Sequence, residues 1–145
     1  MMTIGKLGRA AGVKVPTIRY YEDIGLLPEA ERSAGNQRLY PDSMLSRLCF
    51  IRHARELGFP LDAIRDLLRL AAHPDQPCEA ADQIAGEQLA AVRARIGQLK
   101  ALEGELARMV ASGAHGTVGE CRVIEVLGNH ALCARDHGAG AGVFA

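Results

Sequence analysis

Residues 78–111 read CEAADQIAGEQLAAVRARIGQLKALEGELARMVA, a stretch without a single proline. It predicts one long helix, because Pro74 and Pro77 stand just before it and Ser112-Gly113 just after it. Its large apolar side chains recur at steps of three and four residues and form a narrow stripe of the coiled-coil type: Leu89, Val92, Ile96, Leu99, Leu102, Leu106 and Met109. A hairpin within the chain would need a second long helix, and none follows, so the stripe predicts a homodimer.

Two cysteines flank this helix. Cys78 lies in its first turn, and Cys121 follows shortly after its end. At about 1.5 Å per residue the helix spans roughly 50 Å, so these two thiols of one chain cannot meet. In an antiparallel dimer Cys78 would reach the partner's Cys121, although the stripe by itself is compatible with either pairing direction.

Composition limits the class of protein. The chain has 145 residues, no tryptophan and only 4% aromatic residues, which predicts a modest aliphatic core in a small domain with an oligomerisation element. No run of eighteen apolar residues would span a membrane, and Lys6 and Arg9 interrupt any secretory signal. We therefore expect a soluble cytoplasmic protein. In that compartment its four cysteines are expected to be thiols, metal ligands or redox sensors rather than disulfides.

Charge is distributed unevenly along the chain. Residues 1–70 carry eleven Lys and Arg against eight Asp and Glu, a net charge of +3, whereas residues 71–145 have a net charge of −3. A positive N-terminal half is compatible with binding to a polyanion such as DNA.

The N-terminal residues predict a helix-turn-helix. Thr3 is a suitable cap for a helix that ends at Ala11, and Gly12 begins a tight turn. Pro16 then opens a second helix that continues to about Asp23. Two short helices joined by a glycine-containing turn are typical of this DNA-binding motif.

A small hairpin, or wing, is predicted next, because residues 33–36, Ser-Ala-Gly-Asn, are a turn signal between two short extended segments. The second helix and the wing carry hydroxyl, guanidinium, amide and phenol groups that suit phosphates and base edges. With a lysine of the first helix, the predicted DNA-binding residues are Lys6, Thr17, Arg19, Tyr20, Tyr21, Arg32, Asn36, Arg38 and Tyr40.

Two further helices are predicted, from Pro41 to about Leu57 and from Pro60 to Leu70. In the first of them Cys49 and Phe50 are expected in the core. The resulting fold class is mainly α, with a winged helix-turn-helix, a long antiparallel dimerisation helix and a short metal-binding loop. The expected divisions are a DNA-binding domain (1–70), a linker (71–77), the dimerisation helix (78–111), an effector loop region (112–137) and a disordered tail (138–145).

Several of these motifs together resemble the MerR family of bacterial transcription regulators. They are Ile4-Gly5-Lys6-Leu7, Thr17-Ile18-Arg19-Tyr20-Tyr21-Glu22, Gly25-Leu26-Leu27, Arg38-Leu39-Tyr40, Phe50-Ile51-Arg52, Leu57-Gly58-Phe59 and Ile64-Arg65-Asp66-Leu67-Leu68. The resemblance implies a dimer that binds a palindrome in promoter DNA. On binding its effector, such a regulator bends and untwists the DNA so that RNA polymerase can use the promoter.

The resemblance extends to the metal-sensing branch of that family. Cys78 is similar to the cysteine that sensors of divalent ions carry at the start of the long helix, and Cys121 to the second of two cysteines after it. Ser112 stands about where the first of those two would be, so the usual three-thiolate site is incomplete. The implied effector is zinc, cadmium or lead, with a third ligand from His115 or Cys133, and with His130 and His137 as further neighbours.

One alternative to a metal-responsive regulator belongs to the same family. The same cysteines would serve a regulator that senses oxidants or electrophiles through thiol chemistry. An enzyme is not expected, because no Cys–His pair lies on a catalytic scaffold and no phosphate-binding loop is present.

Overall fold

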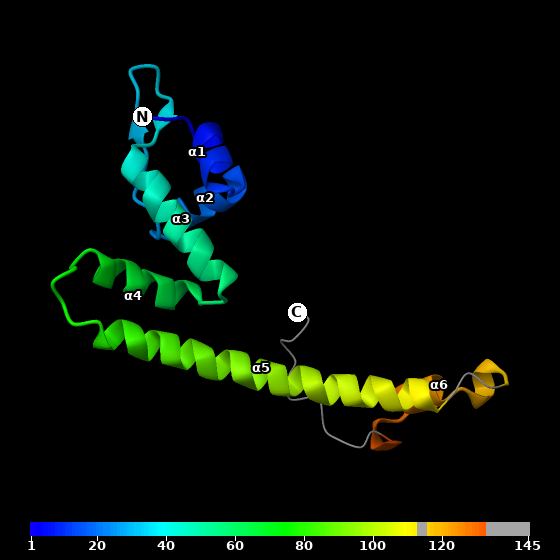
Figure 1. Cartoon of the computed structure of the whole chain (residues 1–145). Coiled ribbons are helices and arrows are strands. Elements are labelled where there is room, and N and C mark those ends of the chain that lie inside the picture. Colours follow the sequence, from blue (N-terminus) through cyan, green and yellow to red (C-terminus); the bar gives the residue numbers. More distant parts are fainter. Residues whose placement is uncertain (113–115, 133–145) are drawn as a thin grey trace. The chain divides into compact units, whose positions relative to one another are not determined.

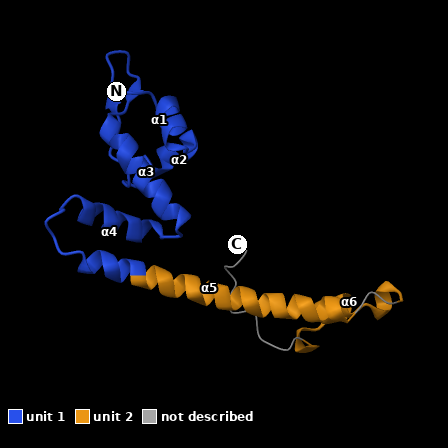
Figure 2. Cartoon of the chain, viewed as in Figure 1, with its two compact units in different colours: residues 1–85 blue, residues 86–145 orange. Residues whose placement is uncertain are grey.

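In a computed structural model of the protein we describe residues 1–112 and 116–132 (Figure 1). The chain divides into two compact units, residues 1–85 and residues 86–145 (Figure 2). The first unit contains helices α1 (Ile4–Ala11), α2 (Val15–Asp23), α3 (Asp42–Glu56) and α4 (Leu61–Ala71), and strands β1 (Glu31–Arg32) and β2 (Arg38–Leu39). Helix α5 (Glu79–Ala111) continues into the second unit, which also holds α6 (Arg122–Gly128) and two 3₁₀ turns, η1 (Val118–Glu120) and η2 (His130–Leu132).

The predicted helix-turn-helix is confirmed. The Thr3 hydroxyl caps α1 by accepting the Lys6 N–H at 3.4 Å, and Pro16 lies in the first turn of α2. Gly12 ends α1 with φ at +69°, a left-handed conformation that favours glycine. A Cβ on Gly12 would also lie 2.7 Å from Nη1 of Arg52, but this is the end of a flexible side chain, so the left-handed backbone is the main reason for glycine there.

The wing is also confirmed, as an antiparallel hairpin. Glu31 pairs with Leu39 and Arg32 with Arg38. The turn closes through the Gln37 N–H, which donates to the Ser33 hydroxyl at 3.1 Å, and Asn36 adopts a φ of +61° that asparagine tolerates. Beyond the hairpin, Tyr40 exchanges two 2.8 Å backbone hydrogen bonds with Met2, which ties the wing to the start of the chain.

One hydrophobic core holds the first unit together. Its buried members come from α1, α2, the segments before and after the wing, α3 and α4: Leu7, Ala11, Ile18, Tyr21, Leu26, Leu27, Tyr40, Met44, Leu48, Ile51, Ala54, Ile64 and Leu68. The expectation for Cys49 and Phe50 was wrong, since both are exposed. Met44, Leu48 and Ile51 define the buried face of α3, Cys49 lies on the opposite side, and Phe50 lies at its margin.

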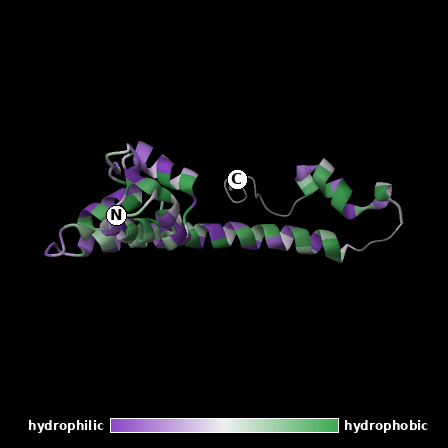
Figure 3. Ribbon diagram, turned by 90° about the horizontal axis from the view of Figure 1, so that it is seen from above, coloured by the Kyte–Doolittle hydropathy of each residue, from purple (hydrophilic) through white to green (hydrophobic). Residues whose placement is uncertain are grey.

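The long helix is confirmed within one residue of its predicted start. Hydrophobic residues recur along its ribbon (Figure 3). Most of the predicted stripe is exposed to solvent in the single chain: Leu89, Val92, Ile96, Leu99 and Leu106. Of the other two members of the stripe, Leu102 is half-buried and Met109, near the end of the helix, is buried. Among the residues that the structure describes, no helix is long and apolar enough to cross a membrane.

Candidate nucleic-acid interface and candidate metal site

Helix α2 presents polar side chains on its outer surface. Arg19 and Tyr20 are exposed and Thr17 is half-buried, whereas Ile18 between them is completely buried. The buried isoleucine fixes which side of α2 faces outward, because side chains one residue apart on a helix differ by about 100° in direction. Lys6 is exposed on α1.

The wing adds a second set of polar groups to the same unit. Arg32 and Asn36 are exposed, and Arg32 donates from Nη1 to the backbone oxygen of Asn36 at 3.1 Å. Arg38 is half-exposed, with Nη1 at 3.8 Å from Oε2 of Glu22 on α2. The wing and α2 are therefore linked by an ion pair between two elements that are expected to face DNA.

Two predicted DNA contacts are revised. Tyr21 and Tyr40 are 8% and 0% exposed and belong to the hydrophobic core, so neither ring is available at the surface of the unit. The pKa of the Tyr40 hydroxyl is raised to about 12, first by burial and then by hydrogen bonding to, and repulsion from, the neighbouring Glu22 carboxylate, while Arg38 and Arg19 oppose the shift. Within the described residues no hydrogen bond of ordinary geometry reaches the Tyr40 hydroxyl, although the Glu22 carboxylate is close enough to act on it as an acceptor.

This burial predicts an alkaline weakness of the fold. Between the ordinary pKa of 10 and the raised value of about 12, unfolded chains lose the Tyr40 proton while folded chains keep it. The free energy of unfolding should therefore fall by about 2–3 kcal/mol as pH rises through that window. Tyr40→Phe should lack this component in urea unfolding, whereas Tyr20→Phe, at an exposed position, should retain it.

At neutral pH the same substitution is expected to change the free energy of unfolding by less than about 1 kcal/mol, because the contact of the hydroxyl with the Glu22 carboxylate lacks the geometry of an ordinary hydrogen bond. A loss of more than about 1 kcal/mol in Tyr40→Phe would show instead that the hydroxyl makes a stabilising hydrogen bond.

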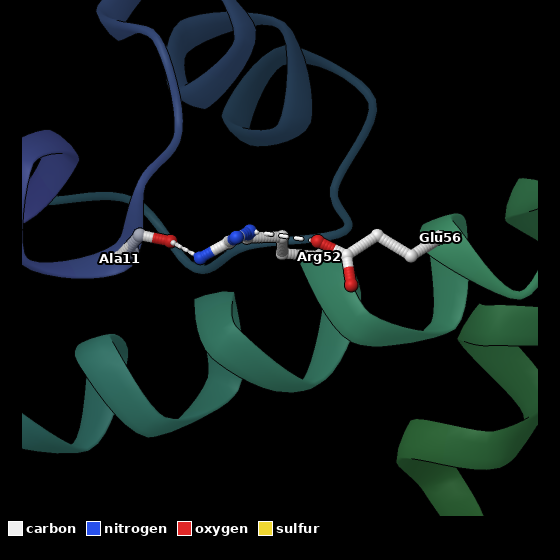
Figure 4. Close-up of polar contacts among 3 residues, drawn as sticks. All are labelled: Ala11, Arg52 and Glu56. Atoms are coloured by element: carbon white, nitrogen blue, oxygen red, sulfur yellow. Dashed lines mark hydrogen bonds and ion pairs between the residues drawn. The ribbon is translucent and has the colours of Figure 1, made fainter.

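Three arginines that the sequence reasoning missed hold the segments around α2. Arg52 donates from Nη1 to the Ala11 oxygen at 3.1 Å and from Nε to Glu56 at 3.0 Å (Figure 4). Arg47 and Arg65 donate to the oxygens of Leu26 and Ile24, at 3.0 and 2.9 Å. These guanidinium groups satisfy backbone oxygens at and beyond the ends of α1 and α2. No sequence signal pairs residues that lie 21 to 41 positions apart.

The first candidate metal ligand, Cys78, is an exposed thiol immediately before α5. Its backbone oxygen accepts the Asp82 N–H at 2.9 Å, so it forms the start of the helix. Its Sγ donates to Oδ2 of Asp82 at 3.7 Å. Asp82 is a residue that the sequence reasoning missed, although the spacing of four residues on a helix predicts that neighbour.

The second candidate, Cys121, lies in the second unit and precedes α6. Its N–H donates to the Val118 oxygen at 3.1 Å, and its own oxygen accepts the Glu125 N–H at 3.0 Å, so both backbone groups are fixed by η1 and α6. Its side chain is half-buried. A pocket lined by residues of α5 and α6, among them Met109, Arg122 and Val126, shows that α6 folds back over the end of α5.

Ser112, which stands where a further cysteine was expected, has a structural role. Its hydroxyl donates to the Arg108 oxygen at 2.9 Å and satisfies a carbonyl at the end of α5. The predicted third ligands, His115 and Cys133, lie outside the described residues, as does His137; His130 is exposed in η2. Within residues 1–112 and 116–132 of one chain, no three Cys, His, Asp or Glu side chains come together as a metal site.

A winged helix-turn-helix followed by a long helix defines a DNA-binding transcription regulator rather than an enzyme. The comparisons specify the family: residues 2–71 match the MerR HTH family regulatory proteins, and residues 45–109 match the family described as MerR, DNA binding. The chain belongs to the MerR family of transcription regulators.

Its relatives align over most of their length. The HTH-type transcriptional regulator ZntR of Escherichia coli K12 is 40% identical over 131 residues, which are 88% of this chain and 92% of that protein. The transcription regulator PbrR691 of Ralstonia metallidurans CH34, solved with lead(II), is 42% identical over 88% of this chain and 99% of the other, with a TM-score of 0.75. MerR of Bacillus megaterium MB1, solved with mercury(II), is 31% identical over 87% and 98%, with a TM-score of 0.63.

Proposed function

We propose that this regulator acts in the cytoplasm as a homodimer that binds promoter DNA and responds to a divalent soft or borderline metal ion. The observation that carries the metal response is the position of two thiols. Cys78 starts α5, and Cys121 follows its end and is held by η1 and α6. Relatives that contain lead(II) and mercury(II) support a thiophilic effector.

The dimer is proposed from the exposed stripe of α5. Five large apolar side chains of this stripe are exposed in the single chain, and apolar surface of this kind favours association. With 33 residues at about 1.5 Å each, α5 is roughly 50 Å long. Antiparallel pairing would bring Cys78 to Cys121 of the partner subunit. The dimer would then have two equivalent pairs of thiolates.

Zinc, cadmium or lead is the expected ion. Two thiolates form the core of a site for any of the three, and a third ligand would discriminate among them. His115 would favour zinc, whereas Cys133 would favour cadmium or lead, because the softer ions prefer sulfur.

The switch is proposed to work through the shape of the DNA. A bound dimer that bends and untwists its site incurs a deformation energy, which its contacts to DNA offset. Metal binding would change the distortion, and so let RNA polymerase use the promoter, while the affinity for the operator stays similar.

Transcription in vitro with purified RNA polymerase tests this function. Zinc, cadmium, lead and mercury should be added singly, under reducing conditions, to a promoter that carries an operator selected from random sequence. We expect at least one ion to change the transcript level strongly while the Kd for the operator changes little. If none acts but an oxidant does so in the presence of a chelator, the thiol-reactive regulator replaces the metal-responsive one.

Contact with DNA through α2 has its own test. Arg19→Ala should weaken operator binding by about 1–3 kcal/mol if the guanidinium contacts a base, and should lower the salt slope by about 0.9 per protomer if it contacts a phosphate. Arg69→Ala is the matched control, since it removes the same charge from an exposed position on α4. Equal affinities of both variants in gel-shift titrations would exclude Arg19 from the interface.

A further inference from the structure

Glu22, near the end of α2, carries a largely buried carboxylate. The side chain of Glu22 is only 9% exposed, whereas that of Arg38, its ion-pair partner, is 41% exposed. The Glu22 carboxylate therefore lies largely inside the unit. The Arg38 guanidinium covers it and is itself partly exposed to solvent. Arg38 is thus held by the carboxylate of Glu22 and is still accessible to a phosphate that approaches from solvent.

The carboxylate is incompletely compensated by its surroundings. The Arg38–Glu22 separation of 3.8 Å is an ion pair but is too long for a hydrogen bond. The other oxygen, Oε1, is buried and makes no hydrogen bond of ordinary geometry among the described residues; the neutral Tyr40 hydroxyl is the neighbouring polar group. Since a buried carboxylate is costly unless it is paired, Glu22 holds Arg38 strongly in the free protein.

Further acidic side chains surround the Arg38–Glu22 pair. Glu22, Asp23 and Glu29 line one polar pocket together with Arg32 and Arg38, the two arginines of the wing. A phosphate that approaches these arginines therefore also approaches three carboxylates, which repel it.

We propose that Glu22 is a specificity-determining residue, which competes with DNA phosphates for Arg38 and so weakens binding to DNA of unrelated sequence. The inference rests on the proposed contact between the wing and DNA. On DNA of unrelated sequence the Arg38–Glu22 ion pair stays intact, so Arg38 adds little to the attraction between the protein and the DNA. On the operator, where α2 docks in register, the wing is held against the backbone and a phosphate displaces the carboxylate from Arg38.

The test uses the full-length protein and a duplex of scrambled sequence, so it does not require the natural operator. Glu22→Gln keeps the shape of the side chain and removes its charge, and it should fold, because it removes an incompletely paired buried charge. We expect tighter binding and a salt slope steeper by about 0.9 per protomer, measured by fluorescence anisotropy across a range of KCl concentrations. Glu31→Gln, an exposed change of the same charge on β1, is the matched control and should change both quantities less.

A double-mutant cycle distinguishes competition from a general charge effect. Arg38→Ala should weaken binding to the scrambled duplex little in the wild-type chain and several-fold more in the Glu22→Gln chain, because only there is the guanidinium free to meet phosphate. Equal losses in both backgrounds would overturn the competition while leaving Arg38 as a DNA contact. No loss in either background would remove the wing contact itself and with it that part of the proposed function. If Glu22→Gln and Glu31→Gln changed the affinity and the salt slope equally, the change in the net charge of the protein would explain both. That result would also overturn the proposal.

Discussion

Cys78→Ser and Cys121→Ser are each expected to abolish the response of the promoter to metal. Either change leaves only one thiolate in each proposed site, and the softer ions depend on sulfur ligands. DNA binding without metal should persist, because neither cysteine belongs to the helix-turn-helix or the wing. The measurements are transcription in vitro with each ion and bound metal by mass spectrometry.

Mixed dimers turn this loss into a test of the pairing direction. If Cys78 of one chain binds with Cys121 of the partner subunit, a dimer of one Cys78→Ser chain and one Cys121→Ser chain has one site without thiols and one complete site. Two different affinity tags would isolate it. We expect such mixed dimers to bind half the metal of the wild type, whereas either variant alone binds almost none.

Two outcomes would contradict this model. If the mixed dimer bound no more metal than either variant alone, a site shared in this way between subunits would be excluded. A full response from Cys78→Ser would exclude the bridging site altogether and favour a sensor that uses Cys121 without Cys78. If the bridging site is supported, His115→Ala and Cys133→Ser identify its third ligand. The variant that lacks this ligand should bind metal more weakly, and the other variant should resemble the wild type.

The second large effect concerns assembly: replacing both Ile96 and Leu99 with Glu should convert the dimer into monomers. Both side chains are exposed in the single chain, at 45% and 41%, and lie in the centre of the stripe. A dimer would contain four such substitutions. At about 1.5 kcal/mol or more for each lost apolar contact, the dimer is weakened by roughly 6 kcal/mol, or about four orders of magnitude in Kd.

Light scattering would measure the change in mass, and gel-shift titration would measure the accompanying loss of affinity for a two-fold symmetric operator. The control places the same two charges on the opposite side of α5, as Ala90→Glu with Ala94→Glu, where both residues are exposed. The control should remain dimeric. Dimers in both variants would show that the chains associate through a surface other than the stripe.

Local sequence determined the elements of this protein closely. The proline before α5, the cap at Thr3, the left-handed Gly12 and the turn at residues 33–36 each act within a few residues of the chain, and the structure has each element where they predict it. The exposed stripe of α5 is equally local, because three- and four-residue steps alone place its members on one side of a helix.

Burial was predicted less well, and the errors have a common cause. Tyr20 and Tyr21 are neighbours of the same chemistry, yet one is exposed and the other belongs to the core. Cys49 and Phe50 were likewise assigned to the wrong side of α3. A helix that carries apolar residues on more than one side has no unique inward face until it is packed against its neighbours.

The chain's sequence by itself therefore determined the order of helices, the wing, the long amphipathic helix and the family motifs. Only the tertiary structure decided which tyrosines are buried, that Glu22 lies beneath Arg38, and that Arg52 reaches back to the end of α1. These contacts join residues 16 and 41 positions apart, and no periodicity or cap encodes such a pair. They form only when the elements pack on the shared core, which sets the position and direction of every side chain at once.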